Sequence, residues 1–203
     1  TVTVSAKVPI TQTFHPVTPV ECTPSSTGWQ DVDLDSYVGS LGDNVTGVIL
    51  HCVNTHASTS LSVKLPCVFI CIHRHVDLHF DAHFWAAIGV DSSHIFEAYV
   101  EDTTSIDVYI VGYTTTGVAF RTNAADKSLS STEAWTDIDC STEAPSAVGL
   151  IFDTTSPSTY YAGLRKNGST DNRYIFVNLH SCFGWIIGCD GSQICEGKIS
   201  NTD

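Results

Sequence analysis

GWQDVDLDSYV, residues 28–38, has a counterpart in AWTDIDCSTEA, residues 134–144. Trp29 and Trp135 are 106 positions apart, and each is followed by two aspartates at the same spacing. The match continues downstream: TGVILHCVNT corresponds to AVGLIFDTTS at an offset of 101, and HFWAAIGVDSSHIFEAYV corresponds to CFGWIIGCDGSQICEGKI at an offset of 99. Agreement over several blocks indicates two copies of one domain, each of roughly 100 residues.

Short segments such as HIFEAYVED and SIDVYIVGY are rich in β-branched and aromatic residues and end in Gly, Ser, Thr, Asp or Asn. No segment shows the period of an amphipathic helix. We therefore predict an all-β protein of two tandem antiparallel β-sandwich domains, jelly-roll or immunoglobulin-like, with a detached N-terminal strand.

The composition narrows the functional class. The 203 residues are 42% hydrophobic and carry a net charge of −13, which argues against nucleic acid as a partner because phosphates would be repelled. No apolar run approaches the roughly 20 residues of a membrane helix, and no basic-then-apolar signal segment opens the chain. With no Met and eight cysteines, we expect a processed, secreted protein whose disulfide connectivity the sequence leaves open.

The two copies differ at their ends. The first finishes with an apolar strand at 106–113, whereas the second stops at Asp203, which aligns with Thr104. At the offset of the tryptophans, the N-terminal TVTVSAKVPITQTF matches DVYIVGYTTTGVAF. The strand that the second copy lacks therefore has its counterpart at the front of the chain. The expected segments are a donor strand at 1–14, a Pro-rich linker at 15–27, a complete domain at 28–120, a linker at 121–133 and an incomplete domain at 134–203.

A sandwich without one strand leaves backbone N–H and C=O groups unpaired along an open, apolar groove. The N-terminal strand is suited to fill such a groove by strand addition. If it fills the groove of the next subunit, the contact is head-to-tail and propagates as a fibre unless a ring closes. The residues expected to make this contact are Val2, Val4, Ala6, Val8 and Phe14.

This arrangement resembles the subunits of bacterial surface filaments that polymerise by donor-strand exchange, as chaperone–usher pilins do. The likeness lies in segments 1–14 and 134–203 and not in a shared motif; pilins carry one incomplete domain, whereas this chain has a complete copy before it. The resemblance implies a structural subunit of a cell-surface filament, with identical subunits as partners and no cofactor. GLRKNGSTDNR and WTDID also resemble repeated β domains of uncharacterised microbial and phage surface proteins.

Three alternatives stay open. The N-terminal strand could close the second domain of its own chain, or the chain could be a fragment of a longer tandem array. A monomeric, secreted carbohydrate-binding protein is the alternative from another functional class, with glycans as its partners. Its candidate residues are the four tryptophans, although repeated tryptophans are more often core residues: Trp29, Trp85, Trp135 and Trp185.

CVFICIHRHVDLHFDAH, residues 67–83, raises the question of a metal site. Read as a strand, it places His73, His75, His79 and His83 on one face, and imidazoles can hold zinc, copper or nickel. Only His79 has a histidine counterpart in the second copy. We therefore interpret this face as solvated and predict no bound metal.

Other motifs are weaker. Asp31 and Asp33 could hold calcium through their carboxylates, although such a pair more often faces solvent. Asn44 and Asn167 lie in N-glycosylation sequons. The chain has no G-x-S-x-G elbow, H-E-x-x-H, phosphate loop or Rossmann glycine pattern, so we expect no enzyme activity.

Overall fold

The computed structural model of the chain describes residues 13–55, 61–65, 68–72, 82–156, 158–177 and 182–202. These residues form antiparallel sheets and one four-residue helix, so the prediction of an all-β protein is confirmed. Within these ranges, no helix is long and apolar enough to cross a membrane. We call residues 13–115 the first half and residues 136–202 the second half.

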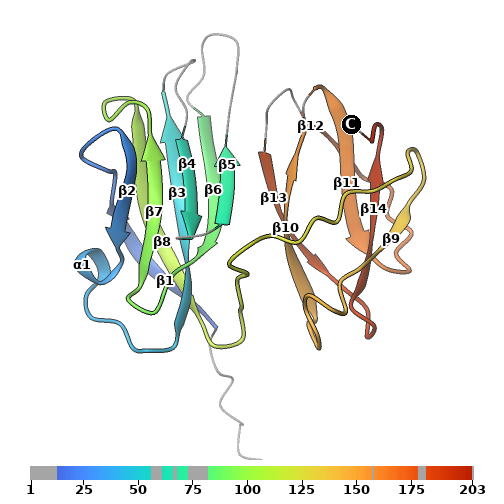
Figure 1. The fold of residues 1–203 in the computed structure, drawn as a ribbon, viewed down its shortest axis with the longest axis horizontal. Helices are drawn as coiled ribbons and strands as arrows, with labels where there is room; N and C mark the ends of the chain where they lie inside the picture. Colours follow the sequence, from blue (N-terminus) through green and yellow to red (C-terminus); the bar gives the residue numbers. More distant parts are fainter. Residues whose placement is uncertain are drawn as a thin grey trace, which may run out of the picture.

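The first half contains two four-stranded sheets, one ordered β1-β8-β3-β6 and the other β2-β7-β4-β5 (Figure 1). Helix α1 (Asp35–Val38) follows β2. The strands are β1 (Phe14–Glu21), β2 (Gly28–Asp33), β3 (Val45–Asn54), β4 (Leu61–Leu65), β5 (Val68–Ile72), β6 (Ala82–Gly89), β7 (Ile95–Val100) and β8 (Ile106–Thr115).

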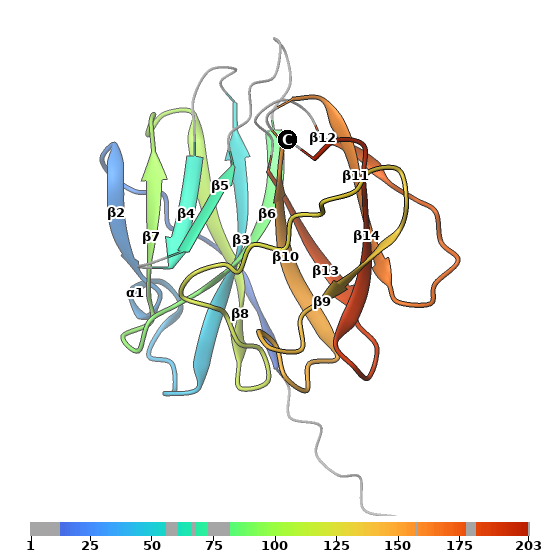
Figure 2. The same ribbon diagram turned by 45° about the vertical axis from the view of Figure 1, so that its right-hand side comes forward.

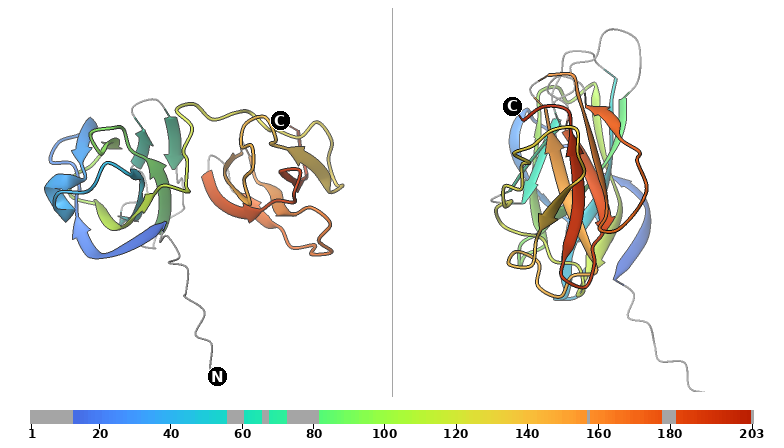
Figure 3. Two further views of the ribbon diagram at one scale, coloured as in Figure 1. Left: turned by 90° about the horizontal axis from the view of Figure 1, so that it is seen from below. Right: turned by 90° about the vertical axis from the view of Figure 1, so that its right-hand side faces the viewer.

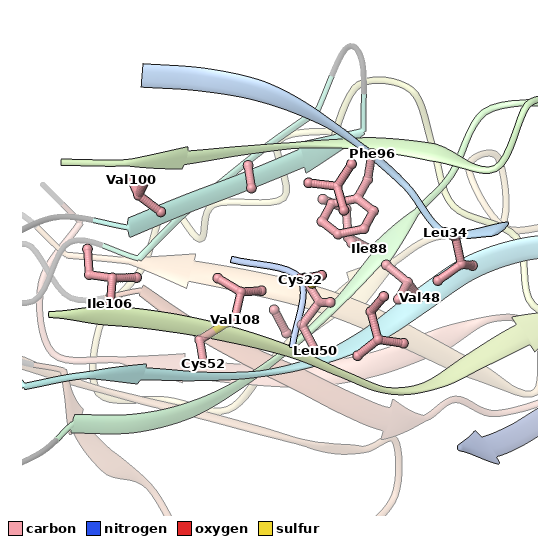
Figure 4. Close-up of a cluster of buried hydrophobic side chains, with 14 of the residues drawn as sticks. Cys22, Leu34, Val48, Leu50, Cys52, Ile88, Phe96, Val100, Ile106 and Val108 are labelled. Carbon is pink, nitrogen blue, oxygen red and sulfur yellow. The ribbon is translucent and has the colours of Figure 1, made fainter. Parts of the chain in front are cut away.

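The two sheets of the first half pack against each other through one buried cluster (Figure 4). Every second residue of β7, of β3 from Val48 to Cys52 and of β8 from Ile106 to Ile110 belongs to it, as the two-residue period of a strand requires. Leu50, Phe96, Val108 and Ile110 have no exposed surface. Each side chain of this kind contributes roughly 1.5–3 kcal/mol by leaving water, so this cluster stabilises both sheets.

The second half has the sheets β12-β11-β14-β9 and β10-β13, shown beside the first half in Figures 2 and 3. A smaller buried cluster lies between them, and Cys195 is its one member with no exposed surface. The strands are β9 (Thr136–Asp139), β10 (Gly149–Thr155), β11 (Tyr160–Lys166), β12 (Ile175–Val177), β13 (Cys182–Gly188) and β14 (Ile194–Ile199).

The strand pairings of the first half recur in the second. Asp31 of β2 pairs with Glu97 of β7, and Asp137 of β9 pairs with Glu196 of β14. The turns after β6 and β13 also agree. In each, an aspartate carboxylate accepts hydrogen bonds at 2.8 and 2.9 Å from the backbone N–H groups two and four residues later; the aspartates are Asp91 and Asp190.

One of the predicted offsets is wrong by a residue. Gly47 of β3 pairs with Gly89, and Gly149 of β10 pairs with Gly188, so β3 and β10 correspond at an offset of 102 and not 101. A one-residue slip exchanges the two faces of a strand. With the corrected offset Val48 corresponds to Leu150, and both point into their buried clusters.

The segment 15–27, which was expected to be a linker, is in part a strand. Its first part lies in β1, which pairs with β8, and its last residues approach β2. Pro16 and Pro19 suggested a spacer, yet proline is accepted in an edge strand because one side of the strand needs no N–H donor. The ladder shifts between Pro16 and Val20, where the prolines lie.

Five cysteines in the described ranges are buried free thiols: Cys22, Cys52, Cys140, Cys189 and Cys195. Burial raises the pKa of the Cys22 thiol to about 12, and it raises the pKa of the Cys52 thiol as well. The Cys22 and Cys52 thiols therefore stay protonated at neutral pH and act as small core residues.

Candidate functional site

Strand β10 has a partner on one side only within the part of the chain that the structure describes. It pairs with β13, and no described strand pairs with its other edge. Its counterpart in the first half, β3, lies between β6 and β8 and pairs with both. Among the described strands, none occupies in the second half the place that β8 has in the first half.

The register shows which backbone groups face this open place. The N–H of Cys189 donates to the C=O of Val148 at 3.2 Å, so the residue pairs joined by hydrogen bonds alternate from there along β10 and β13. Gly149, Ile151 and Asp153 consequently direct their backbone groups away from β13. Such an edge offers a row of donors and acceptors to an added strand.

The apolar residues around the open edge are less well covered than in the first half. Leu50 is fully buried, whereas its counterpart Phe152 is only half-buried. Ile151 and Ile186, which pair on the outer face, are 44% and 79% exposed, and Val148, just before β10, is 89% exposed. The second half therefore presents apolar surface next to unpaired backbone.

The counterpart of β1 is missing from the same place. Residues 116–135 contain no strand, although 120–127 correspond to β1 at the offset of the tryptophans. β1 pairs with β8 alone, so a β1-like strand needs a β8-like partner. Side chains hold this segment instead: Lys127 forms an ion pair with Glu143 at 2.9 Å, and Arg121 donates to the Glu143 carbonyl at 3.0 Å.

Two phenylalanine rings lie directly against glycine backbone at one end of the β8 ladder. A Cβ atom on Gly47 would collide with the Phe120 ring, and one on Gly112 would lie 2.6 Å from the Phe14 ring. The counterpart of Gly47 is Gly149. There a Cβ atom would meet only the Ile187 carbonyl group within 4 Å, so no described ring covers it.

These contacts predict that Gly112→Ala destabilises the first half. The new methyl group would lie 2.6 Å from the Phe14 ring and 2.9 Å from the His15 carbonyl oxygen, and backbone cannot give way as a flexible side chain does. Overpacking of this kind costs about 1–3 kcal/mol.

Denaturant unfolding of Gly112→Ala and of a control variant, Gly191→Ala, checks this prediction. Gly191→Ala is the matched control, because nothing lies within 4 Å of a Cβ atom there. Equal stability of Gly112→Ala and Gly191→Ala would contradict the ring-on-glycine packing.

Of the residues predicted to form the polymerisation strand, Val2, Val4, Ala6 and Val8 lie outside the described residues. Phe14 begins β1, opposite Thr114 of its own chain. It is 46% exposed, so nearly half of its surface is not covered by the chain.

The residues predicted to bind a metal and the asparagines of the N-glycosylation sequons lie apart from one another. His73, His75 and His79 lie outside the described ranges, which contain no group of three or more metal-ligating side chains. Asp31 is exposed, and the Asp33 carboxylate instead accepts hydrogen bonds from the first turn of α1. Asn44 is exposed before β3, whereas the Asn167 amide donates to Asp190 at 2.7 Å.

The four tryptophans lie on four different sheets or beside them. Trp29 tilts against Tyr99, and the Arg165 guanidinium lies 4.2 Å from the centre of the Trp135 ring. Trp185 is half-buried, and Trp85 is 64% exposed.

The position of Gly149 at the open edge of β10 was not predicted from the sequence. The signal that could have found it is the glycine pair itself, because aligning Gly47–Gly89 with Gly149–Gly188 requires the offset of 102.

In comparisons with known proteins, no protein-family model and no curated protein matches the chain.

Proposed function

We propose that the protein is a structural subunit of an extracellular helical filament. It consists of two tandem β-sandwich domains, and it assembles head-to-tail when the N-terminal strand of one subunit enters the second domain of the next. The observation that carries this proposal is the open edge of β10, where the corresponding strand of the first half has β8 as a partner.

The N-terminal segment fits this place by its pattern. At the offset of the tryptophans, Val2 and Val4 correspond to Val108 and Ile110, which are fully buried. Their backbone would pair with the edge of β10 as β8 pairs with β3. Two buried valines contribute roughly 1.5 kcal/mol or more each, beside the hydrogen-bond ladder.

The phenylalanine rings suggest how consecutive domains meet. Phe120 follows β8 and covers Gly47; Phe14 follows the donor segment at the corresponding position. In the joint, Phe14 would cover Gly149 of the neighbouring subunit with its exposed half while its other side stays on Gly112 of its own domain. The pairing of Phe14 in its own first domain is therefore compatible with the joint.

The same spacing gives a regular filament. Phe14 precedes Trp29 by 15 positions, and Phe120 precedes Trp135 by 15 positions. The step between subunits would thus resemble the step between the two domains of one subunit. A contact between different surfaces of identical subunits extends without limit unless the rotation closes a ring.

Electron microscopy of the purified full-length protein tests the proposal. Fibres with a repeat of paired beads are expected. Compact particles would contradict it and would favour a monomer whose N-terminal strand closes its own second domain.

A carbohydrate-binding protein is the second candidate, and Trp85 is the observation that favours it because its indole ring is 64% exposed. The other tryptophans give it little support, since they are covered by neighbours or lie on other sheets. Binding of the monomer to sugars, lost on Trp85→Ala, would support this candidate.

A further inference from the structure

Two histidines from separate strands meet on the outer face of the first half. His51 of β3 lies opposite Trp85 of β6, and His83 lies two residues away from Trp85 on the same strand. His51 Nε2 and His83 Nδ1 are 3.0 Å apart. His83 is exposed and His51 half-buried, so solvent reaches the pair.

Neighbouring rings hold this pair in place. The His51 ring stacks on Trp85, with centroids 4.9 Å apart and planes at 19°. Its edge meets the edge of the His83 ring, whose centroid is 5.2 Å away. Tyr109 of β8 flanks the His51 ring on the other side at 6.2 Å. Stacking restricts rotation of the imidazole and reduces the entropy lost when a ligand binds.

The separation of the two nitrogens fits one metal ion between them. Imidazole nitrogens bind zinc at about 2.0–2.1 Å, so two of them on one ion are about 2.9 Å apart at a right angle and about 3.3 Å apart in a tetrahedron. The separation of 3.0 Å, which the hydrogen bond between the two rings sets in the free protein, lies within this range.

The charge around the pair is also favourable for a cation. Glu21 of β1 pairs with Tyr109, and Asp107 lies two residues before Tyr109 on the same strand, so two carboxylates lie close to this face. The whole chain carries a net charge of −13. A cation is therefore attracted to this surface.

We propose that His51 and His83 form a two-imidazole site for a divalent transition metal, with Cu²⁺ bound most tightly and water at the remaining positions. The order follows the general preference of nitrogen ligands for Cu²⁺ over Ni²⁺ and Zn²⁺. In the free protein the N–H of one imidazole donates a hydrogen bond to the other ring, so metal binding requires this proton to move to the other nitrogen of its own ring.

The site belongs to the first half alone. The counterpart of His51 is Asp153 at the offset of 102, so the pair does not recur at the corresponding place in the second half. It also does not depend on the proposed filament joint, which involves the open edge of β10.

Titration of the full-length protein with CuCl₂ tests the site. Because Trp85 stacks on His51, bound Cu²⁺ should quench its fluorescence in a saturable manner, and electron paramagnetic resonance should show two nitrogen ligands. His51→Gln and His83→Gln should each abolish both signals. Trp85→Phe should lose the quenching but keep the two-nitrogen spectrum.

His15→Gln is the matched control, because His15 stacks on Tyr113 in the same sheet but lies outside the pair; it should leave both signals unchanged. Thermal unfolding checks that each variant remains folded. Because His83 is exposed and His51 is half-buried, His83→Gln should disturb the fold less than His51→Gln. Cu²⁺ binding that survives unchanged in both His51→Gln and His83→Gln would overturn the proposal and would place the metal on other histidines.

Discussion

Removal of residues 1–12 is expected to abolish filament formation and leave a subunit whose first half remains folded. Phe14 begins β1, and the carbonyl oxygen of Thr13 accepts a hydrogen bond from Thr115 at 2.9 Å, so this truncation spares the contacts of the first half. The second half would keep the open edge of β10 and its exposed apolar residues. Electron microscopy and sedimentation measure the loss.

A peptide of residues 1–12, added in trans, should bind the truncated subunits and reduce their self-association, because it supplies the strand without the domain that continues the chain. A peptide with the same residues in scrambled order is the control, since it has the same composition but not the alternation of Val2, Val4 and Val8. Unchanged filaments from the truncated protein would contradict the proposed mechanism.

Val4→Asp is expected to weaken the joint strongly while leaving the separate subunit folded. Val4 corresponds to Ile110, which has no exposed surface, so the aspartate would be buried among apolar side chains without a partner. Burying an unpaired polar or charged group costs roughly 3 kcal/mol or more, which corresponds to at least about a hundredfold weaker association. The critical concentration for polymerisation measures this change.

Thr3→Asp is the matched control for Val4→Asp. It introduces the same charge one residue earlier, at a position that corresponds to the half-buried Tyr109 on the outer face of β8. It should therefore change the critical concentration little. If Thr3→Asp and Val4→Asp are equally harmful, the face assigned to Val4 is wrong, and if neither has an effect, the N-terminal segment is not a buried strand.

Much of the fold could be predicted from the sequence because it depends on local patterns. The alternation in β7 and β8 and the repeated Trp-x-Asp-x-Asp block predicted antiparallel strands whose pairings recur, as Asp31–Glu97 and Asp137–Glu196 do. The offset of β10 was missed by one residue. Apolar residues there lie at adjacent positions, so composition alone does not fix which of them face inward.

β1 was missed for a different reason. Pro16 and Pro19 are typical of a linker, and only the sheet order shows that β1 lies at an edge, where a strand accepts proline. The expectation of a missing strand was built from the alignment of the two copies. What the alignment could not give is the place of the opening, which the pairing of β10 with β13 defines.

The His51–His83 contact was outside the reach of sequence reasoning. The histidines considered for a metal were neighbours along one segment, whereas His83 meets a partner from β3 that is 32 positions away. The relevant spacing is the register between β3 and β6, in which His51 lies opposite Trp85. A strand register of this kind depends on the complete sheet.

A map of the assembled filament from electron cryo-microscopy tests the donor-strand joint directly. We expect a strand along the free edge of β10, traced to Thr1–Thr13 of the neighbouring subunit, with Val2 and Val4 pointing at the second core and Phe14 over Gly149. An edge of β10 that remains open, or one filled by the N-terminal residues of its own chain, would contradict it.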